Sequence, residues 1–392
     1  MKKKILFVLP HMLCGGVEKA LLSLINELPK NDFDISILVV KMEGDFVNII
    51  PNDIKAEEIL LDNTIRNELM LGGIKSSLKY YVSNKHPIKF IKVVCNVLKK
   101  EPLATLTYSF NKIQPLEEIY DTAICFHIHM PFIVKYVAEK VQASNKIAWI
   151  HNDFKMSGFN VKRLKPILNS YNHFFAVSEQ LMEEFVEIFP CFKSCTSIAH
   201  NIVSENYIRQ SLCDSFVDEY NKHEFKILSI GRLDKQKGFD IAIKACKELC
   251  NAGLQFKWYV LGTGVEEKNL RKQVYDLDLT DTFIFLGIRV NPYPYIDQCD
   301  LYVQPSRHEG YGIAVAEARM LNKPIICTDF IGARDQLIDG ETGLIVGVDS
   351  YEIASAVKKM ITDKNLMKLF SNNLMNMQKY DKNEINNIIK FF

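Results

Sequence analysis

Two glutamates eight residues apart stand out as candidate functional groups. Glu309 and Glu317 lie in residues 307–318, which follow an apolar run and begin a helical pattern. Glycines between them let a ligand approach the backbone closely, and unpaired N–H groups at a helix start favour an anion. The segment predicts an anion site with two carboxylates that accept hydrogen bonds from the hydroxyls of one elongated ligand, and the backbone donors come from Gly310, Tyr311, Gly312 and Ile313.

A basic turn, GRLDKQKGFD at residues 231–240, is the second candidate. It also follows an apolar run and precedes a helical pattern. Arg232 supplies a planar donor fork and Lys237 a compact charge, and both suit a diphosphate. Taken alone, this turn is equally well interpreted as a solvated loop. The glycine segment with its two glutamates favours the diphosphate interpretation.

The elements that carry these segments alternate between short apolar runs and amphipathic helical patterns. We predict buried strands at 5–9, 35–40, 122–126, 146–150 and 173–177, and again at 225–230, 257–261, 283–286, 301–304, 325–327 and 344–346. This alternation is typical of doubly wound parallel sheets, which bind ligands at the carboxyl ends of their strands. We expect two domains, residues 1–203 and 204–370, and a helical tail, 371–392, that packs back on the first.

Composition excludes several classes of protein. A net charge of +1 gives no global field for nucleic acid, and no nucleic-acid-binding signature occurs. The ten cysteines are scattered, which favours reduced thiols in a cytoplasmic protein. No run approaches the roughly 18 apolar residues of a membrane span. The apolar start of the chain resembles a signal peptide but is better explained as a buried strand.

One segment leaves two interpretations open. From Lys75 to Lys112 the chain has eight lysines and one acid, with aromatic and aliphatic residues interleaved at near-helical spacing. A basic amphipathic helix on an anionic membrane, at the inner face of the plasma membrane, is one interpretation. The other is a solvated helix that covers the sheet.

Taken together, the motifs resemble those of retaining glycosyltransferases of family 4, which have the GT-B fold. The resemblance rests on GR-x4-KG-x-D and EGYGIAVAEA, and extends over nearly the whole chain through CGGVEKALLSL, WIHND, FFAVSE, VLGTG, FLG, DLYVQPS and GARDQLIDGETGLIV, in the family's order. It implies two Rossmann-like domains facing across a cleft. It also implies transfer of a sugar from a nucleotide diphosphate donor, with uracil as the base, to a hydroxyl of a glycan or lipid-linked glycan in surface polysaccharide synthesis.

The resemblance also implies roles for single residues. Arg232 and Lys237 would bind the donor diphosphate, Glu309 would contact the transferred sugar and Glu317 the ribose hydroxyls. His151 would lie near the reacting sugar, although a strand-end core histidine is the common alternative. The implied catalytic set is therefore Glu309, His151, Arg232 and Lys237.

Other positions have weaker assignments. Gly15 and Gly16 resemble the glycine loop on the acceptor side. Glu18 either contacts the acceptor or compensates the helix dipole, and we favour the dipole. Gly262 and Gly264 lie near the donor or only permit a turn. His127 and His129 follow another strand near the cleft, and for them a site role and a core role are equally plausible.

No cofactor or metal is expected. The two D-x-D strings, at residues 32–34 and 276–278, are interpreted as surface turns, and the basic pair would neutralise the leaving diphosphate instead. Three alternatives remain within this fold: a nucleotide-sugar epimerase, a phosphorylase, and a non-catalytic nucleotide-sugar-binding subunit. The intact set of Arg232, Lys237, Glu309 and Glu317 argues against the last.

Overall fold

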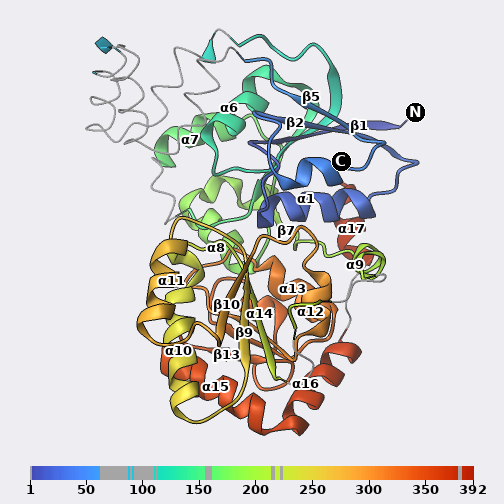
Figure 1. Cartoon of the computed structure of the whole chain (residues 1–392). Helices are drawn as coiled ribbons and strands as arrows, with labels where there is room; N and C mark the ends of the chain where they lie inside the picture. The colour runs from blue at the N-terminus through green and yellow to red at the C-terminus, as the bar shows by residue number, and fades with distance from the viewer. Residues whose placement is uncertain are drawn as a thin grey trace.

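Two parallel sheets, each with flanking helices, make up the molecule (Figure 1). The computed structural model describes residues 2–61, 87–88, 91, 110–111, 113–154, 161–212, 217–220, 224–377 and 382–392. Within these ranges the sheets have seven and six strands, and every observed pairing is parallel. The predicted architecture of two doubly wound α/β domains is confirmed. Nearly all of the segment from Lys75 to Lys112 lies outside the described residues.

The N-terminal sheet has the strand order β3-β2-β1-β4-β5-β6-β7. Its central strands are apolar and buried, because helices cover both faces of a parallel sheet of this kind. The predicted strands correspond to five of the seven; the short edge strands β3 and β7 were not predicted. The bounds are β1 Lys3–Leu9, β2 Phe33–Val39, β3 Lys55–Glu58, β4 Ile119–Cys125, β5 Gln142–Ile150, β6 His173–Ala176 and β7 Thr196–Ile198.

Helices connect these strands on both faces of the sheet. Among the described helices of this domain the longest is α1, which begins at Gly16 directly after the loop that leaves β1. The helices that the structure describes in this domain are α1 Gly16–Glu27, α6 Pro131–Lys140, α7 Val161–Leu168 and α8 Glu179–Ile188, with 3₁₀ turns η1 Asp45–Ile49 and η2 Pro190–Cys195.

The C-terminal sheet has the order β10-β9-β8-β11-β12-β13. All six of its strands were predicted, because each is a short apolar run bounded by turns. They are β8 Lys226–Ile230, β9 Lys257–Leu261, β10 Phe283–Gly287, β11 Leu301–Gln304, β12 Ile325–Thr328 and β13 Leu344–Val346. The helices are η3 Lys235–Lys237, α10 Phe239–Asn251, α11 Glu267–Asp276, α12 Tyr293–Gln298, α13 Ile313–Met320, α14 Ala333–Gln336, α15 Ser350–Thr362 and α16 Lys364–Asn376.

The end of the chain returns to the first sheet. After α9 (Glu205–Ser211) joins the two domains, α17 (Lys382–Ile389) follows the second sheet and lies against the N-terminal domain (Figure 1). Lys3 Nζ donates to the carbonyl of Phe392 at 2.6 Å. The ring of Phe391 stacks on His173 at 3.9 Å between centroids. The last residues therefore pack on the amino ends of the strands β1 and β6.

In each sheet the strand order reverses between two neighbouring strands, β1 and β4 in the first and β8 and β11 in the second. Loops that leave such neighbours diverge to opposite faces, which is where ligands bind in this kind of sheet. Helices α1 and α13, which start after β1 and β11, contact each other across the domain boundary (Figure 1). One buried apolar cluster continues from β1 in the first domain to α13 in the second.

No helix within the described ranges is both long and apolar enough to cross a membrane.

Candidate active site

Lys237 and Glu309 lie in two loops that leave the neighbouring strands β8 and β11. Lys237 Nζ contacts Glu309 Oε1 directly. Ser306 Oγ donates to the same oxygen at 2.8 Å, and Gln304 Nε2 lies 3.4 Å from it. The side chains of the ion pair are 17% and 10% exposed, respectively. The lysine expected to bind diphosphate and the glutamate expected to bind the sugar therefore share one mostly buried position.

Close backbone approach brings these two loops together. Gly238 has φ +68°, and a Cβ there would overlap the carbonyl oxygen of Pro305. Only glycine accepts this combination without strain. The side chain of Asp234 caps η3 by accepting from the Lys237 N–H at 3.2 Å. Together, the glycine and the cap set the position of Lys237 against the neighbouring loop.

An ion pair that was not predicted also joins the loops. Arg307 donates to both carboxylate oxygens of Asp240 at 2.7 Å, and its backbone N–H donates to the carbonyl of Gln236 at 2.7 Å. The hydrogen bonds from Arg307 lower the pKa of the Asp240 carboxyl. The sequence shows both residues inside the motifs, but the partners are 67 positions apart, so no local spacing connects them.

Arg232 takes a different position from Lys237. Its side chain is 63% exposed, and its Nη2 lies 3.3 Å from Asp234 Oδ2. The structure therefore places it at the rim of the basic turn and does not bring it to Glu309.

Gly262 and Gly264 pack behind this turn. A Cβ on Gly262 would overlap the carbonyl of Gly231, and one on Gly264 would overlap that of Leu233. Both glycines therefore have a structural reason that is independent of any ligand: they let the loop after β9 lie against the loop after β8.

The glycine segment before α13 contacts the N-terminal domain. Gly312 caps the helix with φ +82°, and Gln336 Nε2 donates to the carbonyl of the buried Tyr311. A Cβ on Gly310 would overlap the backbone oxygen of His151. The start of α13 thus lies against the end of β5.

Glu317 is almost completely buried, one turn into α13, with 2% of its surface exposed. Its Oε1 is 2.5 Å from Lys19 Nζ, which comes from α1, and accepts from the Tyr293 hydroxyl at 3.0 Å. Its Oε2 is buried and has no hydrogen-bond partner in the part of the chain that the structure describes. Neither Lys19 nor Tyr293 was predicted, because nothing local distinguishes Lys19 from other helix lysines.

On the N-terminal side, Gly15 caps α1 and Gly16 begins it. A Cβ on Gly16 would lie 3.6 Å from the side chain of Ile313, so the starts of α1 and α13 face each other. Glu18 is buried, with 4% exposed, and its Oε1 lies 3.1 Å from His11 Nδ1. It occupies the first turn, as dipole compensation requires, but it faces the Gly15 loop rather than solvent.

Three histidines lie behind this boundary, at the ends of β4 and β5. Burial, with a smaller effect of His127 and His129, lowers the pKa of His151 well below its usual value. Burial also lowers the pKa of His127, and that of His129 to about 3. The ring of His151 packs against that of Phe126, with 4.7 Å between the ring centroids. Its Nε2 has no hydrogen-bond partner among the described residues. These imidazoles are neutral at physiological pH.

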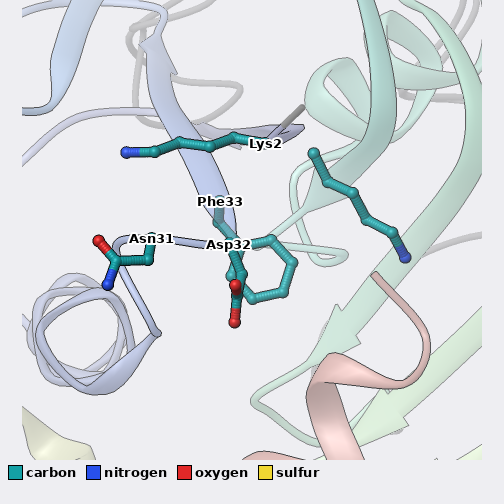
Figure 2. A pocket seen from close by; sticks show the side chains of 5 residues that line it. Lys2, Asn31, Asp32 and Phe33 are labelled. Atoms are coloured by element: carbon teal, nitrogen blue, oxygen red, sulfur yellow. The ribbon is translucent and has the colours of Figure 1, made fainter.

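An open hollow lies at the opposite end of the first sheet (Figure 2). It is bordered by Lys2, Lys3, Asn31, Asp32 and Phe33, at the amino ends of β1 and β2. The first D-x-D string, residues 32–34, lies at this end of the sheet. The second, residues 276–278, begins at the last residue of α11, and its Asp278 has a left-handed backbone with φ +56°. Within the described ranges no three His, Cys, Asp or Glu side chains are grouped to hold a metal ion.

The chain is similar in sequence to known glycosyltransferases. Residues 214–377 match the family model described as glycosyl transferases group 1. The chain is 32% identical to an N-acetylgalactosamine-N,N'-diacetylbacillosaminyl-diphospho-undecaprenol 4-alpha-N-acetylgalactosaminyltransferase of Campylobacter jejuni. The aligned 210 residues cover 53% of this chain and 54% of that protein. The chain thus spans about half the length of this relative. It is 25% identical to the capsular polysaccharide biosynthesis glycosyltransferase CapM of Staphylococcus aureus, over 66% of this chain and 74% of that protein.

Solved structures show the same fold. HepE of Anabaena, in complex with UDP and glucose, superposes with a TM-score of 0.70 at 18% identity, over 99% of this chain and 98% of that one. TarM of S. aureus, in complex with Fondaparinux, alpha-GlcNAc-glycerol and UDP, also gives 0.70, at 15% identity, over 99% of both chains. Residues 214–377 therefore form a glycosyl transferases group 1 domain, and the described chain has the two-domain GT-B fold of these structures.

Proposed function

We propose that this protein is a retaining glycosyltransferase that transfers a sugar from a UDP-sugar to a hydroxyl of a glycan or a lipid-linked glycan. One observation carries the proposal. The Lys237–Glu309 pair and the buried Glu317, whose Oε2 has no partner among the described residues, lie at opposite ends of the glycine segment that opens α13. A sugar, a diphosphate and a ribose have the same linear order.

In this proposal, the diphosphate lies against Lys237 and the amino end of α13. Negative charge develops on the leaving diphosphate in the transition state, and a fixed cation in a mostly buried position stabilises that charge most strongly. Arg232, at the exposed rim, adds a second cation for the outer phosphate. These groups replace a divalent ion in the proposed mechanism.

Glu309 would accept a hydrogen bond from a hydroxyl of the transferred sugar, and Glu317 Oε2 one from the ribose. Retention follows from attack on the side that the diphosphate leaves. The acceptor oxygen bonds to the anomeric carbon as the bond from that carbon to the phosphate oxygen breaks, and the acceptor proton passes to the leaving phosphate. His151, neutral and adjacent to Gly310, would border the reacting sugar.

The names of the relatives support the acceptor class. The Campylobacter protein acts on a diphospho-undecaprenol glycan, and CapM takes part in capsular polysaccharide biosynthesis. We therefore propose a lipid-linked glycan as the acceptor and the cytoplasmic face of the plasma membrane as the place of action. The basic segment from Lys75 to Lys112 would contact anionic lipid there, and salt should release that contact.

The test uses the full chain, a panel of UDP-hexoses and UDP-N-acetylhexosamines, and undecaprenyl-diphosphate glycans, with and without a chelator. We expect UDP release that depends on the acceptor, that survives chelation, and that forms an α-linked product from an α-linked donor. Isomerisation of the donor without an acceptor would show an epimerase instead. Donor binding without transfer to any acceptor would show a non-catalytic binding subunit.

A further inference from the structure

Lys19 connects the N-terminal domain to the carboxylate proposed to hold the donor. Its Nζ lies 2.5 Å from Glu317 Oε1 and 4.8 Å from the centroid of the Tyr293 ring. The lysine side chain is only 15% exposed. It belongs to α1, whereas Glu317 and Tyr293 belong to α13 and α12, so the contact crosses the domain boundary.

The two oxygens of Glu317 differ. Oε1 is occupied by Lys19 and by the Tyr293 hydroxyl, while Oε2 is buried without a partner in the described ranges. An unsatisfied buried carboxylate oxygen is costly, and such groups in proteins normally have a donor. A ligand hydroxyl can therefore bind at Oε2 while Lys19 remains in place.

We propose that Lys19 is a positioning residue that couples donor binding to closure of the two domains. The inference rests on the proposed function, since it assumes that a ribose hydroxyl donates to Glu317. When the domains separate, the ion pair between Lys19 and Glu317 is broken. When they close, Lys19 and Tyr293 hold one side of the carboxylate and leave the other side for the donor.

The ion pair alone contributes little to closure, because removing two charges from water offsets most of their attraction. A bound donor changes this balance: it satisfies Oε2 and fixes α13 in the position that Lys19 contacts. Coupling of this kind is reciprocal, so the closed arrangement must bind the donor more tightly by the same factor. Closure also excludes water from the reacting sugar.

Lys19→Met tests the proposal, with Lys30→Met as the matched control. Lys30 follows α1, is 56% exposed and pairs with Asp53 at 2.7 Å, away from the domain boundary. The probe is UDP, measured by calorimetry, followed by turnover with the UDP-sugar that the wild type uses. We expect Lys19→Met to raise the Kd for UDP about tenfold, which is the usual size of such coupling. Lys30→Met should bind as the wild type does.

Two further measurements separate positioning from general stability. Lys19→Met should increase donor hydrolysis relative to transfer, and Lys19→Arg should restore both the affinity and this ratio. In a double-mutant cycle with Glu317→Gln, the double variant should bind UDP no more weakly than the weaker single variant, since each change removes the same contact.

Unchanged UDP affinity in a folded Lys19→Met variant, or additive losses in the cycle, would overturn the coupling. A lower melting temperature with unchanged affinity and hydrolysis would show a structural role only. A wild-type chain that binds no UDP would instead overturn the proposed function, and the coupling with it.

Discussion

Arg307 and Asp240 form a two-bond ion pair that fastens the loop of Glu309 to the helix that follows Lys237. Both bonds are 2.7 Å long, and the two side chains are 33% and 39% exposed. Among the described residues, neither side chain of this pair is hydrogen-bonded to the side chain of Glu309 or Lys237. The pair instead limits the relative movement of the two loops on which the proposed diphosphate site depends.

Asp240→Asn should therefore reduce activity more than stability. The exposed fraction of the pair limits its contribution to folding to about 1 kcal/mol, after allowance for solvent screening. A small displacement of Lys237 has a larger effect on the chemical step, and we expect turnover to fall about tenfold. Urea unfolding and initial rates measure the two effects. Arg271→Gln, which breaks an exposed pair with Glu267 on α11, is the control; equal losses in both variants would contradict a role for the loop contact.

Lys237→Met and Glu309→Gln should each lower transfer about a hundredfold, because each removes a polar contact proposed for the transition state. Both changes keep the shape of the side chain, which matters since a mostly buried partner is left behind. Lys235→Met is the matched control, because the exposed Lys235 lies on the same 3₁₀ turn. Rates are measured at saturating donor, with circular dichroism to verify folding. Full turnover in either test variant would remove that residue from the mechanism.

Gly310→Ala should separate the domains at the start of α13. The added Cβ would overlap the backbone oxygen of His151, and backbone atoms move only if the domains do. We expect activity to fall about tenfold or more, and the radius of gyration measured by small-angle scattering to increase. Gly253→Ala is the control: its Cβ would meet nothing within 4 Å, although its positive φ costs some stability. A compact, fully active Gly310→Ala protein would show that this approach is not needed.

Stability should decline as the pH falls below about 6.5. The pKa values of His127, His129 and His151 are lowered in the folded protein, mainly by burial, so these three side chains take up protons at a higher pH in the unfolded chain than in the folded one. Each such histidine can lower the free energy of unfolding by up to about 1.4 kcal/mol for each pH unit that the pH falls. Urea unfolding at a series of pH values measures the slope.

His129→Phe should flatten that slope, because the replacement ring can still pack against Phe154, whose centroid lies 4.5 Å from that of His129. The same slope in this variant and in the wild type would exclude His129 as a contributor.

Local pattern determined the order of elements and the two site loops. The strands of the C-terminal sheet are apolar runs between turns, and glycines mark the loop before α13, so neighbouring residues suffice to predict them. The edge strand β3, with the sequence KAEE, lacks such a run and exists only because β2 lies beside it.

The tertiary structure decided which side chains meet. Lys237 contacts Glu309 across 72 positions, and Lys19 reaches Glu317 from the other domain. Tertiary packing also leaves Glu18 buried and Arg232 exposed, although both residues lie in the polar turns that the sequence predicts for them. A side chain's type and its local element follow from its neighbours in sequence. Its partner and its burial depend on how two sheets, their helices and two domains pack together, and no local spacing contains that information.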